Sequence, residues 1–498
     1  MRPFRTDSSR RLPLVAVGLT ALALVSAGCG ARFDRQTVTT QAGGQPNGTV
    51  DDGLGGQGGA GPAPVTSVAP DGTIVTVPGP GSGPGTVPGA TTGPGATTGP
   101  GATTGPGPTT GPTTGPTGGT TTVPAGRRDG VSNTTIKLCY LIPKTGAAQV
   151  PPQVEQGIRA YWEYLKNGPG IYGRQVDVII KDTTSNESVA RSRAQECIDD
   201  KVLAVAALDR LGVQKAIGEY LDDPAAKPPR EVPNIQVQSP VGLAASEQWT
   251  FGITIDHGVQ GAMIAAYFKR KLGASKVAVV YESDAALKPG VARFKSEAAR
   301  LGMEVTYEKQ IDGQQNDFTN EATGLNRSQA TATWLYMAPI PAGKLVNQAD
   351  AIGYHPTWFA NSISWNFDVI FGGAPKALRG AKAFSPWPAL SDPRTALYKR
   401  EYQREYNEPP LDFGVPGWGL GQIFAAAIRN AGPDLGQNSF RHAMQNLKLG
   451  ATSPIDNSPM LWNPLNFSPG VRTGANAVIT FRENGTSWAG EADYRSGY

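Results

Sequence analysis

Cysteine and histidine are scarce in this sequence of 498 residues, which contains 3 of each. Three cysteines are too few for a Cys-rich zinc module or a dense disulfide framework. None of the histidines, His257, His355 and His442, belongs to a His-Glu-x-x-His motif, and the chain after residue 130 has no Gly-x-Ser-x-Gly segment. We therefore expect no metal site, no cofactor and no enzyme. Catalysis by spaced carboxylates, as in an envelope hydrolase, stays open as a less favoured alternative.

Charge is also sparse. The formal net charge is +4, and the first 28 residues hold Arg2, Arg5, Arg10 and Arg11 against Asp7, so the rest of the chain is nearly neutral. It has no run of Lys or Arg that would follow a phosphate backbone. We expect no nucleic acid among the partners.

No apolar segment has the roughly 20 residues that a transmembrane helix needs. The apolar run at residues 14–25 follows an arginine-rich start and precedes small residues, which is the layout of a signal peptide over residues 1–28. Residues 25–29, VSAGC, resemble the bacterial lipobox, in which the cysteine is acylated. By this resemblance Cys29 carries lipid and anchors an exported protein to the outer face of the cell membrane. Plain secretion is the alternative.

Residues 29–130 lack the composition of a folded core. No aromatic residue stands between Phe33 and Tyr140, and the unit GATTGP recurs from Gly89 onward. Such a segment cannot bury enough apolar surface to fold. We predict a disordered Gly/Pro/Thr-rich tether, with a root-mean-square span of about 55 Å if it behaves as a coil.

Beyond the tether, short apolar segments alternate with segments of helical periodicity. One helix shows this well, because Ile158, Tyr161, Trp162 and Leu165 share one face. The predicted strands are residues 136–142, 176–180, 202–208, 234–238, 277–281, 305–307, 333–337, 357–360 and 381–384. Uninterrupted apolar strands linked by helices indicate an α/β fold with parallel sheets covered on both faces. The length favours two similar lobes over one core.

Short motifs in this part of the chain carry a family resemblance. They are PKTG at residues 143–146, Gly157 in the next helix, GIYGR at residues 170–174, Asp182 after the second strand, and Ser239-Pro240 after the fourth. In this order they resemble the type I periplasmic binding proteins, specifically the leucine/isoleucine/valine-binding solute receptors of ABC transporters.

The resemblance covers nearly all of residues 131–498 and implies two doubly wound parallel-sheet lobes joined by a multi-strand hinge. The chain is expected to cross between lobes near Phe251, Phe384 and Met460. Lobe one is then residues 131–251 and 385–459, and lobe two is residues 252–384 and 460–498.

The resemblance also implies a function. Receptors of this family close two lobes around a small ligand and deliver it to an ABC permease. The ligand expected here is a branched-chain amino acid, an amide, or an aromatic or apolar carboxylate. Since the same fold also serves sensing, a ligand-sensing domain that signals to a membrane partner is the alternative. We expect the protein to contact the membrane only through its lipid anchor.

Candidate ligand contacts follow from the strand ends, because ligands of doubly wound sheets lie outside the carboxyl ends of the strands. Lobe one offers Lys144, Thr145, Arg210, Ser239 and Val241, lobe two offers Tyr281, Asp284, Tyr336, Ser362 and Trp365, and Trp418 is expected to close the cleft from behind. Plainer roles are the alternatives: Arg210 pairs with Asp209, Lys144 is a solvated loop charge, and the tryptophans belong to the core.

One motif departs from the amino-acid-binding relatives. In those relatives small hydroxyls and main-chain amides hold the ligand carboxylate, and an acid of lobe two holds its ammonium. This chain has Asp209-Arg210-Leu211 and Ser362 at the matching places. An unpaired ammonium would lose its hydration without compensation, so a plain α-amino acid requires another acid, for which Glu282 or Asp284 is the alternative.

Cys139 and Cys197 are expected to form a disulfide. In a doubly wound lobe with strand order 2-1-3-4-5, the helix after the second strand lies across the first strand. Cys139 lies roughly 10 Å back from the end of its strand, and Cys197 lies roughly 13 Å along the antiparallel helix, so the thiols sit at similar depth. The alternative is two unrelated buried thiols, which holds if Cys139 projects from the opposite face of the sheet.

Overall fold

The computed structural model describes residues 65–68, 74–77, 124–146, 149–239, 243, 248–360, 377–483 and 488–497. The predicted signal peptide and Cys29 lie outside these ranges. The chain divides into two units, residues 1–111 and residues 112–498. None of the described helices is long and apolar enough to cross a membrane.

The N-terminal unit contains one described strand pair. Strands β1 (Val65–Val68) and β2 (Ile74–Val77) are antiparallel. Both are rich in β-branched residues, and the intervening Asp71-Gly72 is a common pair in hairpin turns. The prediction of an unstructured tether over residues 29–130 missed this pair.

Lobe one is built on a five-stranded parallel sheet in the order β4-β3-β5-β6-β7. The strands are β3 (Thr135–Ile142), β4 (Gln175–Asp182), β5 (Ala204–Ala207), β6 (Asn234–Gln236) and β7 (Thr250–Gly252). This is the predicted order 2-1-3-4-5, and it confirms the doubly wound lobe. The central strands β3 and β5 are mostly apolar and buried because helices cover both faces of the sheet, whereas the edge strand β4 has polar and partly exposed residues.

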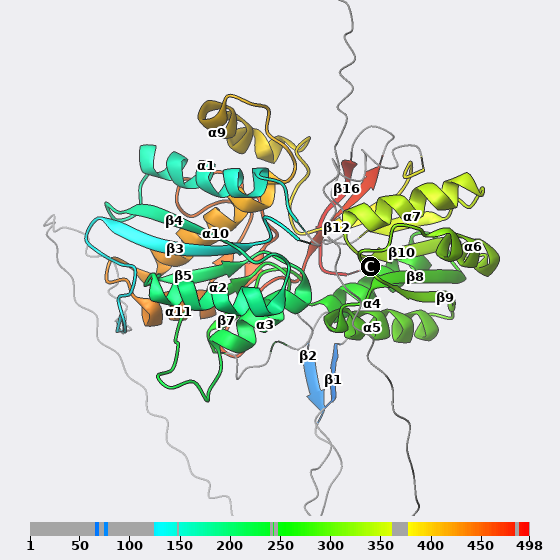
Figure 1. Cartoon of the computed structure of the whole chain (residues 1–498), viewed down its shortest axis with the longest axis horizontal. Coiled ribbons are helices and arrows are strands. Elements are labelled where there is room, and N and C mark those ends of the chain that lie inside the picture. The colour runs from blue at the N-terminus through cyan, green and yellow to red at the C-terminus, as the bar shows by residue number, and fades with distance from the viewer. Residues whose placement is uncertain are drawn as a thin grey trace, which may run out of the picture. The chain divides into compact units, whose positions relative to one another are not determined.

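The helices of lobe one form two layers, seen on the left of Figure 1. The elements are α1 (Gln153–Asn167), α2 (Glu187–Asp199), α3 (Leu211–Leu221), η2 (Pro393–Thr395), α9 (Ala396–Tyr406), α10 (Gly414–Ala431) and α11 (Gln437–Gln445). Helices α1 and α10 share one core with one face of β3, and α2 and α3 share another core with the opposite face. Helices α1 and α10 approach very closely, because a Cβ atom added to Gly157 would lie 2.1 Å from the Gly414 carbonyl oxygen.

The predicted disulfide is present. Cys139 of β3 is bonded to Cys197 of α2, with Cα atoms 6.0 Å apart at a sequence separation of 58. Both side chains are fully buried in the core that α2 shares with β3. Cys139 therefore projects toward α2, which was the open question at the level of sequence.

Lobe two contains a seven-stranded mixed sheet in the order β16-β15-β12-β11-β10-β8-β9. Its elements are α4 (His257–Arg270), β8 (Lys276–Glu282), η1 (Ala285–Leu287), α5 (Lys288–Arg300), β9 (Glu304–Ile311), α6 (Thr319–Ser328), β10 (Ala332–Tyr336), α7 (Pro339–Ala351), β11 (Thr357–Ala360), β12 (Lys382–Ser385), β15 (Val478–Glu483) and β16 (Trp488–Arg495). The part from β9 to β12 is parallel and repeats the strand order of lobe one, whereas β15 and β16 add antiparallel strands. Helices α4 and α5 pack on one face, and α6 and α7 pack on the other.

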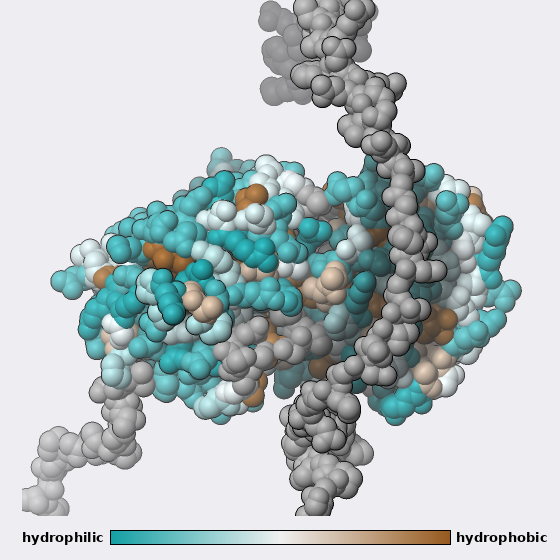
Figure 2. All heavy atoms as spheres, turned by 60° about the horizontal axis from the view of Figure 1, so that its bottom comes forward, coloured by the Kyte–Doolittle hydropathy of each residue, from teal (hydrophilic) through white to brown (hydrophobic). Residues whose placement is uncertain are grey.

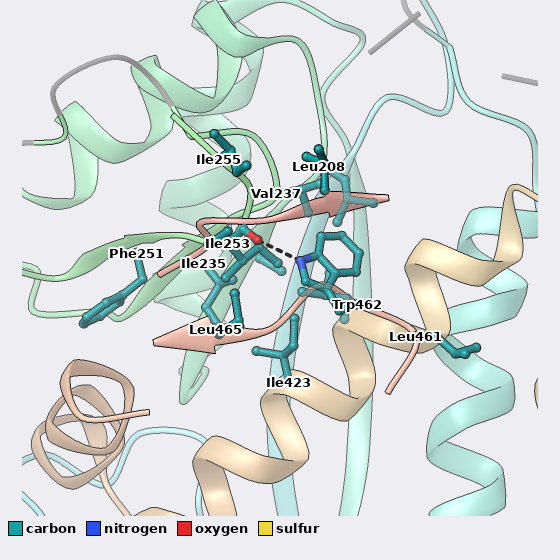
Figure 3. Packing of buried hydrophobic residues seen from close by; sticks show 14 of the residues in the cluster. Leu208, Ile235, Val237, Phe251, Ile253, Ile255, Ile423, Leu461, Trp462 and Leu465 are labelled. Atoms are coloured by element: carbon teal, nitrogen blue, oxygen red, sulfur yellow. Dashed lines mark hydrogen bonds between the residues drawn. The ribbon is translucent and has the colours of Figure 1, made fainter. Parts of the chain in front are cut away.

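The chain returns to lobe two later than the predicted crossing at Met460. Figure 3 shows Trp462 close to Val237 and Ile253, which directly follow the lobe-one strands β6 and β7, and its indole nitrogen donates a hydrogen bond to the Ile253 carbonyl at 2.7 Å. The ring of Phe467 packs against that of Phe251. The short strands β13 (Lys448–Leu449) and β14 (Leu465–Asn466) pair before this segment ends. The first described strand of lobe two after it is β15, so the crossing lies close to Val478.

The folded body also begins earlier than predicted. Residues 124–130, which the sequence assigned to the tether, lie against α11 and lobe one. Gln437 Nε2 donates to the Asp129 carbonyl at 3.2 Å, and Arg127 donates to the Arg230 carbonyl at 2.9 Å. The face of the molecule in Figure 2 is mostly hydrophilic, with scattered apolar residues. The large exposed apolar side chains of the described residues are Tyr172, Val259, Ile340, Ile352 and Val471.

Candidate functional site

A cavity of about 410 Å³ lies between the two lobes. Lobe one contributes the loops after β3, β5 and β6, and lobe two contributes the loops after β8, β9 and β10. Its described wall consists of Pro143, Gly146, Gln149, Val150, Val154, Leu208, Asp209, Arg210, Leu211, Gln214, Val237, Gln238, Glu282, Asp284, Leu287, Gly313, Gln314, Gln315, Asn316, Ala338, Pro339, Ile340, Pro341, Lys344, Trp387, Phe413 and Pro416. Both lobes thus place the carboxyl ends of their parallel strands at one shared site, as the doubly wound topology requires.

Asp209 is a buried acid in the part of the cavity wall that belongs to lobe one, and the residue is only 7% exposed. Its carboxylate accepts hydrogen bonds from the Thr183 hydroxyl and from the Arg210 main-chain N–H, the latter at 2.6 Å. Burial raises the pKa of Asp209 to about 6, and these hydrogen bonds oppose the rise. The Asp209 carboxylate therefore stabilises the conformation of the loop after β5, and it is bonded to groups of the protein itself.

Arg210 provides the positive charge in the same loop. One guanidinium nitrogen donates to the Ser185 carbonyl at 2.9 Å, which holds the side chain over the start of α2. Beside it, Gln238 Nε2 donates to the Asp209 carbonyl at 3.0 Å, and Gln214 bonds the same carbonyl. These hydrogen bonds stabilise the polar part of the cavity wall in lobe one, which includes the Arg210 guanidinium. A guanidinium can donate two parallel hydrogen bonds to the two oxygens of a carboxylate.

Glu282 is a buried acid in the part of the cavity wall that belongs to lobe two, and it is 6% exposed. Its Oε1 accepts the Ala338 main-chain N–H at 2.7 Å. Burial raises the pKa of Glu282, while the Ala338 hydrogen bond and the positive charge of Arg210 act in the opposite direction. Arg210 of lobe one and Glu282 of lobe two thus line the same cavity and lie close enough for the charge of one to affect the other.

The rest of the cavity wall is largely apolar. Trp387 follows β12, and its ring packs against Trp462, with centroids 5.1 Å apart. The other apolar side chains of the wall are Pro143, Val150, Val154, Leu208, Leu211, Val237, Leu287, Ala338, Pro339, Ile340, Pro341, Phe413 and Pro416. An apolar chamber with a few convergent polar groups is typical of a small-molecule site.

Lys144 and Thr145 belong to the loop that forms the rim of the cavity, but their side chains are engaged elsewhere. Lys144 Nζ lies 3.0 Å from Glu155 of α1. Thr145 Oγ1 donates to Asp182 Oδ2 at 2.7 Å. The neighbouring Pro143 and Gly146 line the cavity instead.

Ser239 and Tyr281 also have partners within the protein. The Ser239 hydroxyl is fully buried and donates to the Thr254 carbonyl at 2.6 Å. The Tyr281 hydroxyl donates to Glu308 at 3.4 Å, on the side of lobe two that carries β9. Neither side chain belongs to the described wall of the cavity.

Tyr336 and Trp418 are core residues. The Tyr336 hydroxyl is hydrogen-bonded to His257 Nδ1, and its ring stacks on Trp334 with centroids 4.4 Å apart. Burial lowers the pKa of His257 to about 3, so this histidine is neutral. Trp418 packs edge-on against Tyr161 of α1, with centroids 5.2 Å apart. Our proposal for the ligand site keeps Arg210 and omits the side chains of Ser239, Tyr281, Tyr336 and Trp418.

Val241, Ser362 and Trp365 lie outside the described residues. Among the described wall residues, sequence reasoning singled out Arg210 and Asp284. It considered Glu282 as an alternative acid and missed Gln238, although both stand at strand ends. Phe413 lies in the loop before α10. This loop does not follow a strand, so the rule that ligands lie at strand ends could not identify it.

Comparisons with known proteins agree with this architecture. A model of the periplasmic binding protein family matches residues 135–467. A fatty acid ABC transporter substrate-binding protein from Thermomonospora curvata has a TM-score of 0.63 at 18% identity, covering 75% of this chain and 95% of that one. A branched-chain amino acid transporter substrate binding protein from Streptococcus pneumoniae, in complex with isoleucine, has a TM-score of 0.62 at 18% identity, with 73% and 100% covered.

A third solved structure broadens the range of ligands. An ABC transporter solute binding protein from R. palustris, in complex with benzoate, has a TM-score of 0.58 at 17% identity, with 72% of this chain and 96% of that chain covered. At these identities the solved structures show a shared fold. A search of curated proteins finds no match to this sequence.

The chain belongs to the periplasmic binding protein family, and its fold is that of the type I members. Proteins of this family are extracytoplasmic, bind small molecules and work with ABC transporters. Solute binding is therefore the general function of this chain.

Proposed function

Starting from this family membership, we propose that the protein is an exported lipoprotein whose two lobes close around an amphipathic solute and pass it to an ABC permease. Residues 1–28 direct export, Cys29 carries the lipid, and the Gly/Pro/Thr-rich segment links the anchor to the binding body. The proposal includes no catalytic step.

The observation that carries the ligand class is the placement of Arg210 and Glu282 on opposite lobes of one apolar cavity. A carboxylate fits the guanidinium of Arg210, and an N–H group of an amide or ammonium fits the Glu282 carboxylate. The ligand body contacts the apolar wall around Trp387 and Phe413. The cavity of about 410 Å³ is within the size range of sites for drug-sized ligands.

The solved relatives support a carboxylate on an apolar body. Isoleucine and benzoate are the ligands in two of them, and the third is a fatty acid binding protein by its description. These ligands share a carboxylate and differ in the apolar part. We infer that this chain also binds a solute of that general form.

A thermal-shift screen tests the proposal. The panel contains isoleucine, benzoate and decanoate, each with its primary amide. A ligand that binds only the folded protein raises the melting temperature by mass action. Arg210→Ala should abolish the shift for carboxylates, whereas Arg300→Ala, which removes an exposed arginine of α5, should leave it unchanged. Absence of any shift across the panel would contradict the ligand class.

Anchoring and delivery need cellular tests. Cys29→Ala should move the protein from the membrane fraction to the soluble fraction, because acyl chains bind bilayers by about 0.8 kcal/mol per buried methylene. Deletion of the gene should reduce uptake of a radiolabelled ligand found in the screen. Unchanged fractionation would contradict the anchor, and unchanged uptake would contradict delivery.

A further inference from the structure

A main-chain hydrogen bond joins the two lobes at the edge of the cavity. The Gly212 N–H, in the first turn of α3 in lobe one, donates to Asp284 Oδ2 in lobe two at 3.0 Å. Asp284 follows β8, and its loop contacts α3 through η1. Leu211 and Leu287, which flank this hydrogen bond, are both buried in one core cluster.

Helix α3 lacks a cap from its own lobe. Its N-cap residue is Arg210, whose side chain makes no capping hydrogen bond, and its first turn contains no acidic residue. The first amides of a helix need an acceptor, and its N-terminus favours negative charge. Asp284 supplies both from the opposite lobe.

The side chain of Asp284 is oriented for this contact by a hydrogen bond within its own lobe. Its Oδ1 accepts the Ala286 N–H at 2.8 Å and caps η1 within lobe two. This hydrogen bond orients the carboxylate and directs Oδ2 toward Gly212. Little side-chain freedom is then lost when the lobes meet.

The absence of a side chain at residue 212 is part of the same arrangement. A Cβ atom at Gly212 would lie 2.9 Å from Asp284 Oδ1 and 3.0 Å from Oδ2. Any larger residue would displace the carboxylate. Glycine is otherwise a poor choice in a helix, because alanine is the better helix former.

We infer that Asp284 is a latch that stabilises the closed arrangement of the lobes by capping α3 across the cavity. It is a positioning residue, and its role does not depend on which solute binds. The inference therefore goes beyond the proposed function. Since the apparent affinity of a two-lobe receptor scales with the fraction of closed protein, the latch raises affinity by favouring closure.

The test measures the distance between the lobes. Spin labels are placed at Ser192→Cys on α2 and Ser296→Cys on α5, both exposed, in the full chain with Cys29→Ser. Distance distributions from double electron–electron resonance, recorded without added solute, give the ratio of closed to open protein. Asp284→Ala should shift this ratio about five-fold toward the open form, which is the effect of losing one helix cap.

Asp317→Ala is the matched control, because Asp317 accepts the Thr319 N–H at the start of α6, at 2.9 Å and within lobe two. It should leave the distances unchanged. Gly212→Ala should open the lobes as Asp284→Ala does, although alanine favours the helix and should not lower its stability. Near-ultraviolet circular dichroism verifies that each variant is folded. Unchanged distances in a folded Asp284→Ala or Gly212→Ala variant would overturn the latch, whatever the outcome of the solute screen.

Discussion

Asp182 holds Thr145 by two hydrogen bonds: the Thr145 hydroxyl donates to Oδ2 at 2.7 Å, and the Thr145 N–H donates to Oδ1 at 3.2 Å. The N–H groups of Lys144 and Thr184 donate to the same carboxylate. The end of β4 thereby determines the conformation of the loop after β3, which forms one rim of the cavity.

Replacement of Asp182 by Ala should therefore loosen that rim. Burial favours the neutral acid, but the hydrogen bonds from Thr145 and the main chain outweigh it and hold the pKa of Asp182 below its usual value. Its contribution to stability is present above about pH 4 and is lost as the pH falls through the lowered pKa. We expect Asp182→Ala to lower the free energy of unfolding by about 1–2 kcal/mol at pH 7.

Denaturant unfolding from pH 3 to pH 7 measures this contribution. Asp177→Ala, at an exposed position of the same strand, is the control and should change the free energy of unfolding little. An equal loss at pH 3 and pH 7 for Asp182→Ala would refute the electrostatic part of the explanation.

The raised pKa of Asp209 predicts that its contribution to the free energy of unfolding changes with pH in the opposite direction. Burial raises its pKa to about 6 in the folded protein, above its value in the unfolded chain, so the folded state binds the proton more tightly. The associated stability is present below about pH 4 and is lost as the pH rises through 6. Asp209→Asn should abolish this decline, so that the variant gains on the wild type between about pH 4 and pH 7 and the difference is constant at higher pH. Parallel unfolding curves of the two proteins over that range would contradict the assignment.

Gly157 should tolerate no side chain. A Cβ atom there would lie 2.1 Å from the Gly414 carbonyl oxygen, so Gly157→Ala must separate α1 from α10. We expect a loss of about 1–3 kcal/mol in the free energy of unfolding. Gly343→Ala in α7, where no atom lies within 4 Å of the added carbon, is the control and should be neutral or stabilising. Similar effects of both substitutions on thermal unfolding would contradict the close contact.

The disulfide should contribute strongly to stability. It closes a loop with a sequence separation of 58, for which the chain-entropy model gives roughly 4 kcal/mol. Protein reduced while unfolded and then refolded should show a lower urea midpoint than oxidised protein. Two titratable thiols in the unfolded, unreduced body would show that Cys139 and Cys197 are not bonded.

Much of this fold could be predicted from the sequence because local patterns encode it. Apolar runs marked most of the parallel strands in both sheets but missed β7, and the antiparallel strands β15 and β16 were not predicted. The strand order then placed Cys139 beneath Cys197. The late crossing of residues 460–477 could not be predicted, because it depends on the contact of Trp462 with Ile253, which is distant in sequence.

The candidate site was less accessible to sequence reasoning. Strand ends identify a loop, but they do not specify which side chain turns toward the cavity. Tyr281 and Glu282 are neighbours, yet Tyr281 bonds Glu308 while Glu282 lines the cavity. Trp387 and Phe413 reach the site from connections whose positions depend on the packing of the whole body.

The most direct test of this account is the affinity difference between a carboxylate and its primary amide, measured by titration calorimetry with the best ligand of the screen. Wild-type protein should prefer the carboxylate by at least about ten-fold, because a charge-assisted pair with Arg210 is stronger than a neutral hydrogen bond. Arg210→Gln should remove that preference, and Arg300→Gln should preserve it. Equal affinity of the wild type for both forms, or a preference that survives Arg210→Gln, would contradict the claim that Arg210 recognises the ligand carboxylate.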